Sequence, residues 1–166
     1  VVNGASLVKD RFGIPNSAYY FDGVNDNIVV QHDSLLNIGI YEDFIISMWI
    51  KPSENFMLGN NNSILKKVSA DSSWNYQYKV DGDTSTFNFN VSPSEITYNE
   101  SLFPLNSGQW YYLTIMKEQN RIVHFVDGDT IFSYIDSARV GINNGDMVIG
   151  GSSNGCLLYT SPSPRD

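Results

Sequence analysis

The chain has 166 residues and a net charge of −8, with 18 acidic and 10 basic side chains, and 42% of its residues are hydrophobic. This length is sufficient for one domain with a buried core. The acidic balance argues against nucleic-acid binding, which needs clustered Lys and Arg to neutralise phosphates. No apolar run reaches the roughly 20 residues of a membrane-spanning helix, so we expect no membrane insertion. The aromatic content of 13% favours strands.

The first strong pattern lies at residues 18–30, where aromatic residues precede a polar turn and β-branched residues follow it. The turn contains Asp22-Gly23 and Asn25-Asp26-Asn27. Two strand-like runs joined by a polar turn are typical of a β-hairpin. We therefore predict a hairpin in this segment.

Residues 43–52 predict another strand, which ends at Pro52. One face of this strand is wholly apolar and the other is mixed. Further strand-like runs follow at residues 63–67, 74–80, 86–91, 109–117, 121–126, 130–134 and 146–150, with a short one at 95–98 inside a long loop at 92–108. No segment shows helical spacing of apolar residues, so we predict an all-β protein. The residues predicted to lie between its sheets are Phe21, Phe44, Ile46, Met48, Ile50, Leu113 and Ile115.

The pentapeptide Val-Asp-Gly-Asp-Thr occurs twice, at residues 80–84 and 126–130. An Asp-Gly pair between alternating runs is a strong hairpin signal, because both central residues of the turn take positive φ. We therefore predict two similar tight turns at these positions.

Several motifs, in this order along the chain, resemble the laminin-G-like (concanavalin A-like) jelly-roll domains of secreted bacterial proteins, including those of Bacteroidetes-like bacteria. They are the segment 10–13, the run at 18–30, the strand at 44–52, the Gly-x-Trp strand at 108–114, the aromatic-Val-Asp-Gly turn at 125–128 and the strand at 147–151 with its glycine pair. The resemblance implies a two-sheet antiparallel jelly-roll sandwich. It also implies a module of a secreted or cell-surface protein that binds glycans or protein partners, sometimes with Ca²⁺.

The last eleven residues, 156–166, resemble the in-frame translation of a sequencing adapter. We expect residues 1–155 to form a laminin-G-like domain that lacks its final strand or strands, and residues 156–166 to be a non-native tail. The alternative is a genuine Pro/Ser-rich linker. If the tail is non-native, its Cys156 is no part of the natural protein, which then has no cysteine chemistry.

Catalytic signals are weak. Jelly-roll glycoside hydrolases carry a Glu-x-Asp-x-x-Glu strand that places carboxylates on one face, and the scattered glutamates of this chain form no such triplet. The segment 151–155 matches Gly-x-Ser-x-Gly, but that motif needs a strand-to-helix turn in an α/β fold. His32 and His124 are isolated, without the spacing of a zinc site. We therefore predict no catalytic residues.

A calcium site is the stronger metal candidate, because Ca²⁺ takes hard oxygens from carboxylates and turn carbonyls. Asp22, Gly23, Asn25 and Asp26 offer several such oxygens within one turn. The resemblance implies that an acidic residue of the missing last strand completes the site, so we expect it to be incomplete in this fragment. The alternative is a turn shaped by Asp and Asn side chains that bond to their own backbone.

The candidate glycan site is an aromatic stripe, because sugar rings stack on aromatic faces and amides bind their hydroxyls. Trp74, Tyr76 and Tyr78 share one face of a predicted strand, and Asn61 and Asn62 lie in a preceding polar loop. A stripe of this kind is more often part of the core.

We predict a non-catalytic extracellular or cell-surface recognition module that binds a glycan or a cell-surface protein and adjoins other domains of a larger protein. One alternative is a structural or adhesion spacer without a small-ligand site. Another is a degenerate glycoside hydrolase, which the missing carboxylate triplet argues against.

Overall fold

A computed structural model describes residues 1–38, 42–54, 62–69, 74–81, 86–91, 103–135 and 142–151. Strands make up most of this part of the chain, and a short 3-10 turn, η1 (Ser34–Leu36), lies between two of them. The strands are β1 (Val2–Asn3), β2 (Ser6–Val8), β3 (Ala18–Tyr20), β4 (Asn27–Val30), β5 (Phe44–Ile50), β6 (Asn62–Val68), β7 (Trp74–Asp81), β8 (Thr86–Val91), β9 (Tyr111–Glu118), β10 (Arg121–Val126), β11 (Asp129–Ile135) and β12 (Met147–Gly150). No helix in the described ranges is long and apolar enough to cross a membrane.

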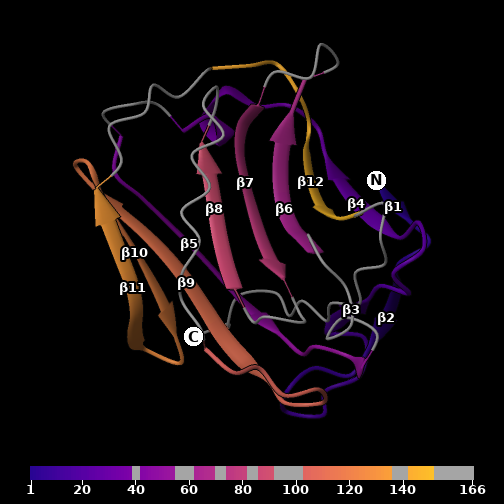
Figure 1. The fold of residues 1–166 in the computed structure, drawn as a ribbon. Coiled ribbons are helices and arrows are strands. Elements are labelled where there is room, and N and C mark those ends of the chain that lie inside the picture. Colours follow the sequence, from indigo (N-terminus) through magenta and orange to yellow (C-terminus); the bar gives the residue numbers. More distant parts are fainter. Residues whose placement is uncertain are drawn as a thin grey trace.

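The strands form two facing sheets and a small ribbon. The larger sheet has the order β1-β4-β12-β6-β7-β8, the smaller has the order β11-β10-β9-β5, and β2 pairs with β3. All pairs are antiparallel. Figure 1 shows the smaller sheet facing one side of the larger one, with the N-terminal strands at the opposite side of the fold. The molecule is therefore an all-β jelly-roll sandwich, as the sequence predicts.

The core lies between the two sheets and is built by alternation along each strand. In β9, Tyr111, Leu113 and Ile115 are buried while the residues between them are half-exposed. Each fully buried Leu or Ile contributes about 1.5–3 kcal/mol relative to its exposed state. Among the predicted core residues, Phe21, Ile50, Leu113 and Ile115 are fully buried. Phe44, Ile46 and Met48 are partly buried and pack against this core.

The predicted hairpin at residues 18–30 is wrong in one respect. β3 pairs with β2, whereas β4 pairs with β1 and β12, so the two runs lie in different sheets. The physical reason lies in the connection, where Phe21 is fully buried and Asp26 is almost fully buried. A connection that inserts Phe21 into the core separates its two strands instead of pairing them.

The turn at Asp127-Gly128 confirms the predicted geometry, with φ of 53° at Asp127 and 91° at Gly128. It joins β10 to β11 with Val126 paired to Asp129. The matching turn after Asp81 falls at residues 82–85, outside the described part of the chain, as do the predicted short strand at 95–98, most of the predicted loop at 92–108 and the tail at 156–166.

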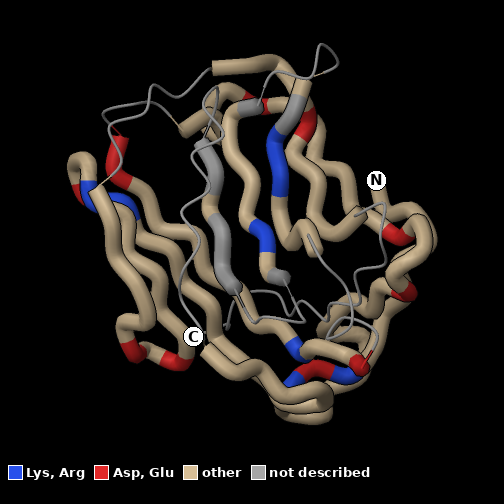
Figure 2. The backbone as a smooth tube through the Cα atoms, viewed as in Figure 1, with Lys and Arg blue, Asp and Glu red and all other residues tan. Residues whose placement is uncertain are grey.

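Charged residues lie mainly at strand ends and in turns, and the middle parts of the smaller sheet are uncharged (Figure 2). The outer face of β5 carries Ile45, Ser47 and Trp49, because the even positions of this strand face the core. Across β9 the register places Tyr112 opposite Trp49 and Thr114 opposite Ser47. This outer face is where half-exposed aromatic residues and hydroxyl-bearing residues come together.

Candidate functional site

The structure places the predicted aromatic stripe in the core. Tyr76 is 3% exposed and Tyr78 is 1% exposed. Their rings pack on Phe89, with centroid distances of 6.3 and 6.4 Å. Burial raises the pKa of Tyr76 to about 12, because a buried phenolate loses its hydration. A side chain covered in this way has no free face for a sugar ring, so the core interpretation holds for these two tyrosines.

The remaining predicted glycan-binding residues are Asn61, Asn62 and Trp74. Asn62 is fully buried and belongs to β6, so it is not part of an exposed loop. The physical reason is that β6 begins at Asn62, one position earlier than the alternating pattern indicated. Asn61 and the side chain of Trp74 lie outside the described part of the structure.

The predicted calcium-binding turn is held together by its own side chains. The backbone N–H of Asp22 donates to Oδ2 of Asp26 at 2.8 Å, and the N–H of Val24 donates to Oδ1 of Asp22 at 2.8 Å. Gly23 has a φ of 80°, and Asn25 is exposed. These bonds match the alternative of a self-bonded polar turn.

The described residues therefore do not present a ready calcium site. Asp26 is 7% exposed and its carboxylate packs against Gly4, so a cation would have to displace existing contacts. No group of three or more His, Cys, Asp or Glu side chains that could hold a metal occurs in the described ranges. A calcium site at this turn that is incomplete in this fragment stays a prediction.

A cavity of about 710 Å³ opens between the sheets beside β5. Its lining is mainly aliphatic, aromatic and thioether. At its mouth Leu35 is 90% exposed and Ile45 is 68% exposed. Sugar hydroxyls need hydrogen-bond partners when they leave water. An apolar cavity of this kind is therefore a poor carbohydrate site.

A buried lysine, which was not predicted from the sequence as a site residue, forms hydrogen bonds between two segments at one end of the sandwich. Lys67 of β6 is fully buried, and its Nζ lies 3.1 Å from Nδ1 of His32. The ammonium also donates to the carbonyl of Gly145 and, at 3.4 Å, to that of Asn143. Burial lowers the pKa of Lys67, and the nearby Asp146 opposes this effect. The contacts join β6 to the segment before β12.

A partly exposed aromatic and cationic cluster lies on the outer face of the smaller sheet. We call it the Arg11 platform, formed by Arg11, Phe12, Trp49 and Tyr112. The rings of Trp49 and Tyr112 lie 5.0 Å apart at an interplanar angle of 34°. Cζ of Arg11 lies 4.0 Å from the centre of the Trp49 ring and 4.1 Å from that of Phe12. Phe12 is 68% exposed, whereas Arg11, Trp49 and Tyr112 are half-buried, so the cluster is partly open to solvent.

The loop that carries Arg11 is fixed by Asp10. Its Oδ1 accepts hydrogen bonds from the backbone N–H groups of Phe12 and Ile14, both at 2.9 Å. The cross-strand pair of Trp49 and Tyr112 is fixed by the register of β5 and β9. Binding groups held on rigid elements need little ordering when a ligand arrives. The platform is therefore largely formed before any ligand binds.

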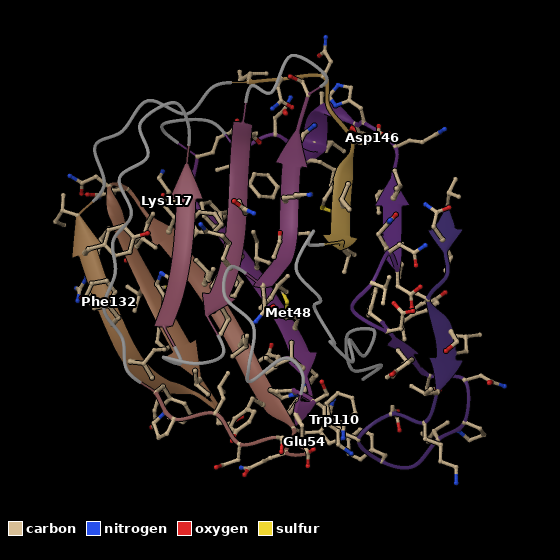
Figure 3. All side chains as sticks on the ribbon, turned by 45° about the vertical axis from the view of Figure 1, so that its right-hand side comes forward. Met48, Glu54, Trp110, Lys117, Phe132 and Asp146 are labelled. Carbon is tan, nitrogen blue, oxygen red and sulfur yellow. The ribbon has the colours of Figure 1, made fainter. Side chains whose placement is uncertain are left out.

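The platform and the lysine contacts occupy different ends of the sandwich. Trp110, which directly precedes β9 and lies two positions before Tyr112, is at the end opposite Asp146 (Figure 3). In the sequence, the segment 10–13 stands out only as a motif. The mixed outer face of residues 43–52, with Trp49 in it, was the signal that could have identified one half of the platform.

Comparison with solved structures shows the same fold in proteins of different kinds. The receptor-binding domain of botulinum neurotoxin C/D mosaic serotype matches with a TM-score of 0.72 and 14% identity, over 97% of this chain and 41% of that chain. Trypanosoma rangeli sialidase in complex with sialic acid matches with a TM-score of 0.67 and 11% identity, over 96% and 26%. The carbohydrate-binding module CBM66 from Bacillus subtilis matches with a TM-score of 0.55 and 14% identity, over 97% and 94%.

These identities establish a shared fold alone, and the chain spans about two-fifths of the neurotoxin domain and a quarter of the sialidase. No curated protein matches by sequence. A family model described as the concanavalin A-like lectin/glucanases superfamily matches residues 20–160. The motif order, the two facing antiparallel sheets and this match agree, and the chain belongs to the laminin-G-like family of that superfamily.

Proposed function

We propose that this chain is a non-catalytic recognition module that binds carbohydrate at the Arg11 platform, within a larger secreted or cell-surface protein. The observation that carries the proposal is the pair of Trp49 and Tyr112, whose rings lie 5.0 Å apart on an outer sheet face. Neighbouring hydroxyls of Ser47 and Thr114 follow on the same face. Aromatic rings beside hydroxyl donors suit sugars, which have apolar C–H faces and polar rims.

Two further observations support binding over catalysis. Glu42, Glu54 and Glu118 are exposed and far apart in the sequence, and no buried carboxylate pair of the kind used for glycoside hydrolysis is found among the described residues. CBM66, which matches nearly end to end, is a carbohydrate-binding module by its own description. This likeness is an analogy of fold and does not name a ligand.

A glycan array followed by titration calorimetry tests the proposal. The intact 166-residue chain should bind at least one glycan, and Trp49→Ala and Tyr112→Ala should each weaken that binding by about 10-fold or more, as is usual for an aromatic anchor. Leu35→Ala is the control, because Leu35 is exposed at the mouth of the apolar cavity and is not one of the platform residues.

Two outcomes would overturn the proposal. Absence of binding to every glycan on the array would favour a structural or adhesion spacer. Binding that Leu35→Ala abolishes and Trp49→Ala leaves intact would move the site to the cavity. Circular dichroism melts of each variant separate loss of binding from loss of folding.

A further inference from the structure

The guanidinium of Arg11 has no polar partner in the described part of the protein. Its contacts there are the rings of Phe12 and Trp49, and no hydrogen bond or ion pair to it is present among those residues. The adjacent carboxylate of Asp10 is engaged by two backbone N–H groups of its own loop. A guanidinium carries five N–H donors in one plane. Within the described ranges, none of these donors is taken up by a protein acceptor.

The two rings contact the guanidinium through its carbon atom and leave its N–H groups without a ring partner among the described residues. Both rings contact the guanidinium over their faces, at 4.1 and 4.0 Å from Cζ. Stacking of this kind covers the flat sides of a guanidinium and leaves the N–H groups along its edge. Two parallel N–H groups at such an edge match the two oxygens of a carboxylate. The platform thus combines a carboxylate receptor with aromatic surfaces that suit a sugar ring.

We propose that Arg11 makes the platform selective for carbohydrates that bear a carboxylate, such as uronic acids and sialic acids. This inference rests on the proposed function and adds the chemical class of the ligand. The net charge of −8 opposes the approach of an anion. At 0.15 M salt, charges more than about 8 Å away are largely screened, so the direct pair with Arg11 decides the preference.

The test compares each acidic sugar with its neutral counterpart by titration calorimetry. One pair is 3′-sialyllactose and lactose, and the other is trigalacturonate and its methyl ester. The two pairs distinguish a sialic acid from a uronic acid as the source of the carboxylate. The intact chain should bind one acidic member about 10- to 100-fold more tightly than its neutral counterpart, which is the range for a charge-assisted pair.

Arg11→Gln should remove this preference, so that the acidic and neutral sugars bind with equal affinity. Arg11→Lys should keep only part of the preference, because a lysine lacks the planar donor edge. Lys9→Gln is the matched control, since it removes one positive charge from an exposed position two residues away in the chain. If Arg11 had only a structural role, its substitution would change the affinities for acidic and neutral sugars alike and would leave their ratio unchanged.

Failure of this inference is distinguishable from failure of the proposed function. In one outcome Trp49→Ala abolishes sugar binding, but the affinity ratio of acidic to neutral sugar is near one in the unmodified chain. In another the ratio is the same in Arg11→Gln as in the unmodified chain. Either outcome overturns carboxylate selectivity and leaves the platform as the sugar site. If Lys9→Gln lowers the ratio as much as Arg11→Gln does, the effect comes from overall charge, and the role of Arg11 is again overturned. If the chain binds no sugar of either kind and none on the array, both proposals fail.

Discussion

The carboxylate of Asp26 occupies the space where a side chain at position 4 would lie, so Gly4 and Asp26 fit together only because residue 4 is a glycine. A Cβ built on Gly4 overlaps Oδ1 of Asp26 and lies 2.9 Å from its Cγ. Oδ2 of the same carboxylate accepts the backbone N–H of Asp22 at 2.8 Å. The first residues of the chain thereby hold the turn that leads into β4.

Gly4→Ala should therefore destabilise the protein more than Gly13→Ala. Both glycines have positive φ, 74° and 81°, so an alanine costs about 1–2 kcal/mol in backbone strain at either position. Gly13 has nothing within 4 Å of an added Cβ, whereas at Gly4 the carboxylate must move and lose its bond to Asp22. Urea unfolding of both variants measures the difference, and equal losses would contradict the contact.

Ile115→Ala should lower the free energy of unfolding by about 2–5 kcal/mol, since Ile115 is fully buried between the sheets. Ile45→Ala is the matched control, because Ile45 is 68% exposed on the outer face of β5. It should cost less than about 0.5 kcal/mol, the usual limit for surface substitutions. Similar effects at both positions would show that the inward and outward faces are wrongly assigned.

Acid should destabilise the fold through His124. Burial lowers the pKa of His124 to about 4, from 6.5 in an exposed chain. Its ring packs among Tyr78, Phe132 and Tyr134, and neither ring nitrogen has a hydrogen-bond partner in the described part of the chain. Because the unfolded chain binds the proton more readily between these two pKa values, stability is full above about pH 6.5 and falls as the pH drops toward 4.

The expected loss from this group is about 2 kcal/mol between pH 7.5 and pH 5. His124→Phe removes the titrating ring and should reduce the pH dependence by that amount, with no loss of stability at pH 7.5. Urea melts of both proteins at the two pH values give the comparison. An identical slope in the two proteins would rule out His124 as the cause.

Lys67→Met should increase hydrogen exchange in the segment before β12. Asn143 and Gly145 are buried, so their carbonyls lose the lysine ammonium without gaining water. Loss of such bonds costs about 1–3 kcal/mol, although removal of a buried charge offsets part of it. Lys66→Met is the control, since Lys66 is only partly buried and bonds to one carbonyl, that of Gly151 at 3.2 Å. Hydrogen exchange at residues 143–148 reports the change, and equal exchange in both variants would refute it.

Millimolar Ca²⁺ should leave the melting temperature unchanged, because the carboxylates of Asp22 and Asp26 already accept backbone N–H groups. A cation that bound the folded state would raise the melting temperature by mass action. A calcium-dependent rise that Asp22→Ala abolishes would establish the turn as a metal site and overturn this expectation.

Local patterns along the chain were enough to predict most strands. Alternation predicted 86–91 and strand-forming residues predicted 121–126, both with the bounds that the structure has, because both signals act within a single strand. The positive φ values at Asp127 and Gly128 were predictable for the same reason, since the turn depends on its own residues.

Only the tertiary structure decided which sheet each strand joins and which aromatic side chains lie on an outer face. β3 and β4 adjoin in sequence and lie in different sheets, because Phe21 between them is buried in the core. Tyr78 and Trp49 both sit in alternating strands, yet Tyr78 is buried and Trp49 lies on an outer face beside Arg11. Alternation divides a strand into two faces, but the partner sheet determines which face is covered. The contact between Arg11 and Trp49 joins residues far apart in sequence, so no local pattern contains it.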